Sequence, residues 1–197
     1  MVIRNAVALL LCASLPSFAQ TTPPAGTPAL NSAAVHRPDQ PVKAILARWF
    51  RGYEFVPTDA DFARLGPRLG GALRDLAGDP NVDLIARVRA VSAMVYAAEP
   101  ATAQFVAALL ADSSAASVLR RKAALVLGER LGPEAIPGLV SAFYGAPDDV
   151  YLREACAKAL GRLGAASRAV RERLRSAESS PTVRAFLADA KRLGDTP

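Results

Sequence analysis

The chain has 197 residues and 51% hydrophobic content, so it can form one helical domain that packs through small side chains. The net charge of +6 is modest, and lysine and arginine are mixed with aspartate and glutamate, which indicates solubility rather than nucleic-acid binding. The one histidine and the one cysteine that remain once the amino-terminal signal is removed are too few for a zinc site of thiolates and imidazoles. We therefore expect no catalytic residues, metal or cofactor in this chain.

Residues 1–19 are predicted to be a secretory signal peptide. Arg4 gives the segment a positive start, residues 6–13 are apolar, and Ala19 is one of the small residues that a signal peptidase reads. The pattern predicts cleavage before Gln20 and export to the periplasm or the medium. An uncleaved segment that anchors the chain in a membrane is the alternative, and only then do we expect contact with a membrane.

Residues 20–41 contain five prolines among Thr, Ser and Ala, a composition typical of a disordered linker. The only histidine, His36, lies in this segment, far from any predicted nucleophile. It cannot complete a Ser-His-Asp triad within the fold.

Residues 42–79 are predicted to form an atypical first hairpin of two helices. Apolar residues recur at helical spacing in both halves, and Thr58 followed by Asp61 is a helix-start pattern. Gly66 and Pro67 weaken the second helix, which predicts a kink or a separate turn there.

This hairpin also carries an aromatic cluster, for which we consider two interpretations. We favour a hydrophobic cap that seals the first repeat, because terminal repeats need such a cap. The alternative is an exposed anchor for a partner. The cluster consists of Trp49, Phe50, Tyr53 and Phe55.

The rest of the chain repeats one helical pattern. Each copy reads apolar, Arg, two variable residues, a small or apolar residue, and Ala, and the two central copies end on Leu-Gly. Such self-similarity is the signature of a repeat architecture. We align the copies at residues 88–93, 119–124, 152–157 and 183–188.

Gly132 and Pro133 separate two helices in the middle of this region. A glycine supplies the left-handed residue that ends a helix, and a proline is tolerated at the start of the next one. Ser117 is expected to cap the helix that precedes them. Two such helices cannot bury both apolar stripes alone, so we predict an all-α fold, an α-solenoid of about four stacked hairpins with a C-terminal capping helix. Its predicted parts are hairpins at about 42–79, 82–111, 117–145 and 149–177 and a cap at 181–194, within a repeat domain of residues 42–197.

Two copies of a sequence motif begin at Leu119 and Leu152 and read Leu-Arg-x-x-Ala/Cys-Ala-x-x-Leu-Gly. This motif resembles the short bacterial HEAT-like repeat of the phycobilisome-lyase type. The resemblance covers about residues 80–194. It implies a right-handed superhelix whose second helices line a concave, partner-binding side. It also implies that the early arginine of each repeat pairs with an aspartate in the preceding turn. The implied pairs are Arg89 with Asp83, Arg120 with Asp112, and Arg153 with Asp149.

Two further features have a structural and a functional interpretation. Cys156 falls on the apolar stripe of its helix and, with Cys12 removed in the signal, would be the only cysteine of the mature chain. We predict a buried hydrophobic residue rather than a reactive thiol. Asp148 and Asp149 precede a helix, where carboxylates more often cap the helix than act as an acid, a base or a cation site.

The predicted partner site is a strip of arginines on second helices. On the predicted helix 165–177, three arginines fall opposite the stripe of Ala166, Ala169, Val170 and Leu174, and two more belong to the first hairpin. The alternative is a solvated face that keeps the protein soluble. The five residues are Arg64, Arg68, Arg168, Arg171 and Arg175.

These features together predict a non-catalytic scaffold of the bacterial cell envelope that binds another protein along its concave face, and not an enzyme or a nucleic-acid-binding protein. The alternatives are an enzyme or enzyme accessory of the HEAT-like lyase type and a membrane-anchored structural protein.

Overall fold

The computed structural model describes residues 41–52 and 55–188. The predicted signal peptide, the linker up to residue 40 and Tyr53 lie outside the described residues, as does the end of the predicted cap beyond residue 188. The predictions for Cys12 and His36 therefore stay predictions.

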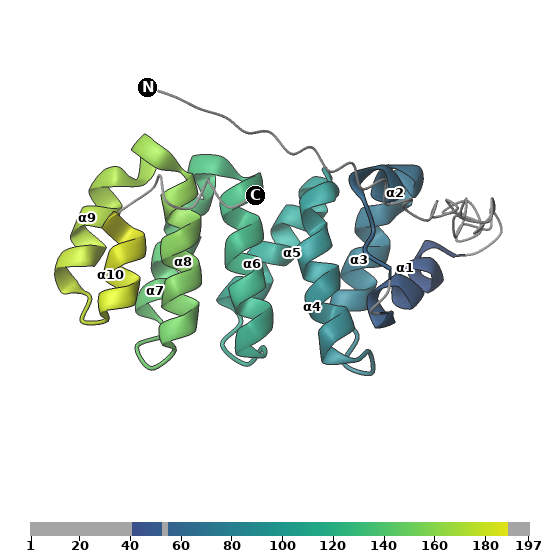
Figure 1. The fold of residues 1–197 in the computed structure, drawn as a ribbon, viewed down its shortest axis with the longest axis horizontal. Helices are drawn as coiled ribbons and strands as arrows, with labels where there is room; N and C mark the ends of the chain where they lie inside the picture. The colour runs from purple at the N-terminus through teal and green to yellow at the C-terminus, as the bar shows by residue number, and fades with distance from the viewer. Residues whose placement is uncertain (1–40, 53–54, 189–197) are drawn as a thin grey trace, which may run out of the picture. The chain divides into compact units, whose positions relative to one another are not determined.

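Within the described residues the chain is helical and contains no strand, which confirms the predicted all-α class for that part (Figure 1). Short 3₁₀ turns, labelled η, precede α3, α7 and α9. The helices are α1 (Val42–Arg51), α2 (Asp59–Arg64), α3 (Leu69–Gly78), α4 (Leu84–Ala93), α5 (Pro100–Ala111), α6 (Ser117–Arg130), α7 (Ile136–Tyr144), α8 (Val150–Arg162), α9 (Arg168–Ala177) and α10 (Pro181–Ala188).

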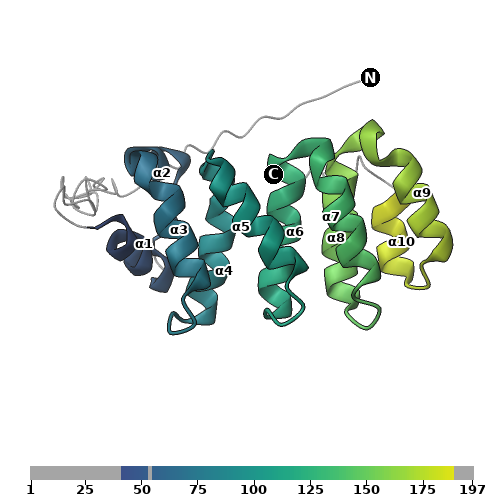
Figure 2. The same ribbon diagram turned by 180° about the vertical axis from the view of Figure 1, so that it is seen from behind.

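Helices that are close in the sequence pack against one another. The first helices of successive hairpins contact each other in the order α1, α4, α6, α8 and α10, and among the second helices α3 contacts α5 and α5 contacts α7. Each second helix also packs on the first helix that follows it, and both views place α6 beside α8 (Figures 1 and 2). The core between these helices is built from alanine and leucine, so the backbones approach closely.

The predicted helix boundaries in this region are confirmed at three points. Gly132 has φ +58°, the left-handed conformation that a glycine adopts without strain. The chain forms a separate 3₁₀ turn at Gly66–Arg68, and Gly66 also has a positive φ. Thr58 and Asp61 form a capping box in which each side chain accepts a hydrogen bond from the other residue's main-chain N–H. Ser117 differs from its predicted role, because α6 begins at Ser117 and has no side-chain cap.

The repeats are 33 residues apart at α4, α6 and α8, and this changes the alignment of the first copy. Leu119 and Leu152 are fully buried at equivalent positions, and the residue buried at that position in α4 is Ala86. Arg87 is therefore the equivalent of Arg120 and Arg153, two residues before the expected Arg89. The sequence has arginines at both 87 and 89. Which of them is equivalent to Arg120 depends on where the helix begins, and the structure has it begin after Asp83.

These three equivalent arginines bind main-chain carbonyls rather than the expected aspartates. Each donates a hydrogen bond to a carbonyl at or just beyond the end of the preceding second helix: Arg87 Nε to Ala77 at 2.9 Å, Arg120 Nε to Leu110 at 3.1 Å, and Arg153 Nη1 to Ala146 at 3.1 Å. The last carbonyls of a helix have no partner within that helix. The repeated arginine therefore joins each first helix to the helix before it.

The aspartates of the expected pairs have other roles. Asp83 and Asp149 cap α4 and α8 by accepting from main-chain N–H groups of the first turn, which confirms the prediction that Asp149 caps a helix. Asp112 accepts from Ser114, and this is the main reason why its pKa lies below the ordinary value, with a smaller contribution from the charge of Arg120. Arg89 donates to the carbonyls of Phe50 and Gly52.

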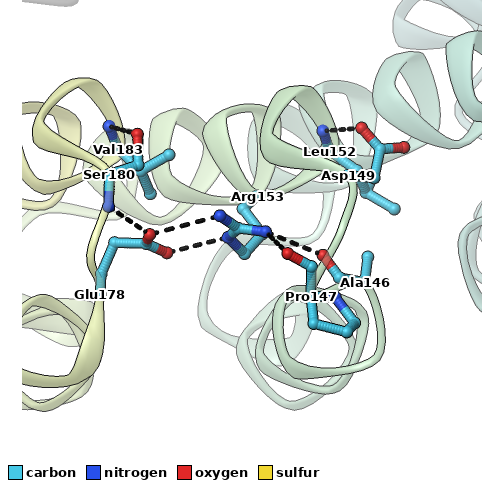
Figure 3. A network of polar contacts seen from close by, with 8 residues as sticks. All are labelled: Ala146, Pro147, Asp149, Leu152, Arg153, Glu178, Ser180 and Val183. Carbon is cyan, nitrogen blue, oxygen red and sulfur yellow. Dashed lines mark hydrogen bonds and ion pairs between the residues drawn. The ribbon is translucent and has the colours of Figure 1, made fainter.

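The acidic partner of Arg153 is Glu178, in the loop between α9 and α10 (Figure 3). The Nε atom lies 2.9 Å from Oε2, and the two side chains are only 12% and 4% exposed. Arg153 also donates to the carbonyls of Ala146 and Pro147, and Glu178 accepts from the N–H of Ser180. Burial alone would raise the pKa of Glu178, but Arg153 and these hydrogen bonds hold it below its ordinary value. Arg153 thus connects the loop that precedes α8 with the loop between α9 and α10.

Candidate functional site

The exposed faces of α5 and α7 carry no charged side chain. Neither helix contains Asp, Glu, Lys or Arg over its full length, although both have a solvent-exposed side. The two helices contact each other, so these faces adjoin. The exposed residues are Pro100, Ala101, Gln104, Ala107, Ala108 and Ala111 of α5 and Pro137, Gly138, Ser141 and Tyr144 of α7. We call this set the neutral face.

A hollow of about 460 Å³ opens beside the neutral face, between α5 and the end of α6. Ala103 and Gln104 are among the α5 residues that line it, and the charged side chains of Glu99 and Arg130 border it. Alanines leave room for the side chains of another molecule and lose no side-chain rotamer freedom on burial. This hollow, at the edge of the neutral face, can receive a side chain of a partner.

The predicted arginine strip is not continuous in the structure. Arg64 and Arg68 are exposed next to α3, and Arg168 and Arg175 are exposed on α9. Arg64 forms an ion pair with Asp61 at 3.0 Å. In the order of the second helices, α5 and α7 lie between these two groups, and neither contributes a basic residue. The arginines therefore flank the neutral face instead of forming one strip.

Arg171 is not part of any exposed strip, because it is only 6% exposed. Its guanidinium donates to the Leu187 carbonyl at 2.8 Å, to the Ser167 hydroxyl at 3.1 Å and to the Gly164 carbonyl at 3.3 Å. The bond to Leu187 joins α9 to α10, and the other two hold the turn that precedes α9. Arg171 therefore has a structural role, and the expected exposure of its side chain is wrong.

The reason is the spacing of Arg171 and Leu174 within α9. The sequence predicted one helix over 165–177 with Ala166 and Ala169 inward, yet both of these residues are exposed and Leu174 is buried. Residues Gly164–Ser167 form a 3₁₀ turn, so Ala166 lies outside the helix. Within α9, Arg171 lies three residues before Leu174, so the two side chains share one face of the helix and are buried together.

The aromatic cluster forms both a buried cap and an open pocket. Trp49, Phe50 and Phe62 are about 95% buried, which agrees with the favoured cap. Tyr96, which the sequence analysis did not include, is 43% exposed and stacks on Phe62 with ring centroids 4.5 Å apart. Phe55 is half-buried and lies 5.3 Å from Trp49 between ring centroids. Between them lies a pocket of about 310 Å³, which we call the aromatic pocket.

Cys156 is fully buried and free, as predicted. Burial raises the pKa of its thiol from 9.0 to about 12, so the nucleophilic thiolate is scarce at neutral pH. Among the described residues, no group of three or more His, Cys, Asp or Glu side chains could hold a metal ion. None of the helices in the described ranges is both long enough and apolar enough to cross a membrane.

No protein-family model matches this chain, and no curated protein matches it either.

Proposed function

We propose that this protein is a non-catalytic scaffold that binds another protein along the concave face of an α-solenoid of HEAT-like repeats, the side lined by the exposed surfaces of its second helices. The observation that carries the proposal is the neutral face of α5 and α7, which is free of charge over both helices while exposed arginines flank it.

One property of the neutral face, its lack of charged side chains, is shared with the centres of protein–protein interfaces. The centres of such interfaces are depleted of charged residues, and arginine and tyrosine are enriched relative to the rest of the surface. On the neutral face, Tyr144 is 55% exposed and can serve as the aromatic anchor. A solvent-exposed helix with no interaction partner normally carries charged residues, as α9 does with Arg168, Glu172, Arg173 and Arg175.

The order of helix contacts supports the solenoid arrangement. Contacts that run from α4 to α6 to α8, with second helices packed alongside, are those of repeats that touch only their neighbours. The Arg87, Arg120 and Arg153 hydrogen bonds recur at the same position of three first helices, as a repeat requires. The resemblance to HEAT-like repeats is consistent with this arrangement.

Site-specific photo-crosslinking in cells tests the proposed face. A photoreactive residue at Gln104 or Ser141 is expected to capture one discrete partner, and the same residue at Tyr151 of α8 is the control, since Tyr151 is 63% exposed on a first helix. Ala108→Glu is expected to reduce the crosslink about tenfold, because it buries a charge at the centre of the interface. Equal crosslinks from Tyr151 and Gln104 would contradict the proposal.

We also propose that the scaffold is exported, on the pattern of residues 1–19. Amino-terminal sequencing of protein from the cell envelope or the medium is expected to begin at Gln20. A chain that still begins at Met1 and sediments with membranes would instead support the anchored alternative.

A further inference from the structure

A charged pocket lies between α6 and α8, and it shares no residue with the neutral face. Its volume is about 230 Å³. Both views place these two helices side by side (Figures 1 and 2). Four charged side chains line the pocket, two from each helix: Arg121 and Lys122 of α6, and Glu154 and Lys158 of α8. We call it the α6–α8 pocket.

The charges that line this pocket do not cancel. Lys158 Nζ lies 2.5 Å from Glu154 Oε1, so these two side chains neutralise one another. Arg121 and Lys122 form no ion pair and no hydrogen bond through their side chains with any other described residue. Asp149 interacts with Arg121 through its charge, without an ion-pair contact. The pocket therefore has two positive charges that no carboxylate contacts within the part of the chain that the structure describes.

The repeat itself does not require a charge at position 121. The repeated arginine of α6 is Arg120, which already donates to the carbonyl of Leu110. The counterpart of Arg121 in α4, 33 residues earlier, is Val88. Arg121 is nevertheless half-buried, and its Nε atom is buried with no hydrogen-bond partner among the described residues. Burying a charged group without a partner is costly, so this arginine needs an explanation other than the fold.

Tyr151 positions the guanidinium of Arg121 without using its hydrogen-bond donors. The Cζ atom of Arg121 lies 5.4 Å from the centroid of the Tyr151 ring. A guanidinium on an aromatic face is attracted by the electrons of the ring, so its N–H groups stay available for an acceptor. The planar fork of a guanidinium matches the two oxygens of a carboxylate. Lys122 adds a second positive charge to the same pocket.

We propose that the α6–α8 pocket binds a small organic anion, a carboxylate joined to an apolar group. Arg121 and Lys122 supply the opposite charge, and the half-buried side chains of Val118 and Leu125 supply apolar surface. Pockets for drug-sized ligands measure about 300–1,000 Å³, so a volume of about 230 Å³ limits the ligand to a smaller molecule. This site is independent of the protein partner proposed for the neutral face.

Phenylacetate is a suitable probe, because it joins a carboxylate to an apolar ring. Titration of the isotope-labelled full-length protein is expected to shift the amide resonances of α6 and α8 in a saturable way. Phenylacetamide has the same shape without the charge and is the control ligand, and sodium chloride at the same ionic strength is the control for salt. No saturable shift with phenylacetate at millimolar concentration, or the same shifts with phenylacetamide, overturns the proposal.

Variants locate the binding. Arg121→Gln is expected to weaken phenylacetate binding about tenfold, because a hydrogen bond from a charged donor is lost. Lys122→Gln, which leaves Arg121 in place, should weaken it about threefold. Arg173→Gln removes the same charge at an exposed position of α9 outside the pocket and should leave binding unchanged. Equal effects of Arg121→Gln and Arg173→Gln in folded proteins would overturn the assignment.

Glu154→Gln is expected to change the affinity in the opposite direction. The substitution removes the negative charge of the pocket and releases Lys158 from its ion pair, so phenylacetate should bind about threefold more tightly. Glu172→Gln, at an exposed glutamate of α9, is the matched control and should have no effect. Weaker binding to the Glu154→Gln protein, or an equal gain with Glu172→Gln, would contradict the proposed site.

The two sites can fail separately. Ala108→Glu changes the neutral face and is expected to leave phenylacetate binding intact. If crosslinking from Gln104 fails while phenylacetate still binds, the neutral face is refuted and the α6–α8 pocket stands. The converse result refutes only the pocket. A protein captured by a photoreactive residue at Tyr151 would show that a macromolecule covers the pocket, and it would overturn the assignment to a small anion.

Discussion

Replacing Arg153 with alanine is expected to lower the free energy of unfolding by about 3 kcal/mol. The substitution leaves the carboxylate of Glu178, which is only 4% exposed, without its ion pair, and it also removes the donor to the carbonyls of Ala146 and Pro147. Breaking a buried pair by removing one partner costs more than the pair itself contributes, because the remaining charge stays desolvated. Urea unfolding followed by far-UV circular dichroism measures the loss.

Arg162→Ala is the matched control. Arg162 on α8 also pairs with a glutamate of another element, Glu129 at 3.1 Å, but the two side chains are 42% and 52% exposed. Water screens such a pair, so we expect a loss of less than about 0.5 kcal/mol. If Arg153→Ala and Arg162→Ala lower the unfolding midpoint equally, burial does not determine the contribution of these pairs.

The same pair predicts a pH dependence. The pKa of Glu178 is lower in the folded protein than its ordinary value of 4.5. Such a group stabilises the fold fully above pH 4.5, and the contribution is lost as the pH falls through the folded-state pKa. Glu178→Gln should therefore lose less stability than the unmodified protein between pH 6 and pH 3. An equal loss in both proteins would show that the carboxylate is not held in its charged form.

Gly128→Ala is expected to destabilise the protein by about 2 kcal/mol, although alanine is the better helix former. Gly128 lies inside α6 where that helix crosses α8. A Cβ atom there would lie 2.8 Å from Cβ, 2.9 Å from Cα and 3.0 Å from the carbonyl oxygen of Ala159. None of these atoms belongs to a flexible side chain, so the two helices must separate. The strain outweighs the gain of about 1 kcal/mol in helix propensity.

Gly138→Ala is the control of opposite sign. Gly138 is also helical, in α7, but no atom lies within 4 Å of an added Cβ. The substitution then changes only the helix propensity of this position, so we expect the free energy of unfolding to rise by about 0.5–1 kcal/mol. Thermal and urea unfolding of both variants test the pair. A stabilised Gly128→Ala protein would mean that α6 and α8 do not approach as closely as the structure has them.

The sequence alone was sufficient for much of the local structure, although not for the cap of α6 or the start of α9. Helices follow from apolar spacing, the left-handed break from Gly132, and the start of α2 from the capping pair of Thr58 and Asp61, because each depends on residues within one or two turns. The lack of charged residues in α5 and α7 is also visible in the sequence. Which of their residues form an exposed surface is known only from the structure.

Only the tertiary structure decided which side chains meet. Arg171 is buried where α9 packs on α10, and its guanidinium donates to the carbonyl of Leu187. Arg153 meets Glu178, 25 residues away, and Trp49 meets Phe62, because neighbouring helices bring them together. Local patterns determine where helices begin and end. Partners across helices depend on how those helices pack, which no short stretch of sequence contains.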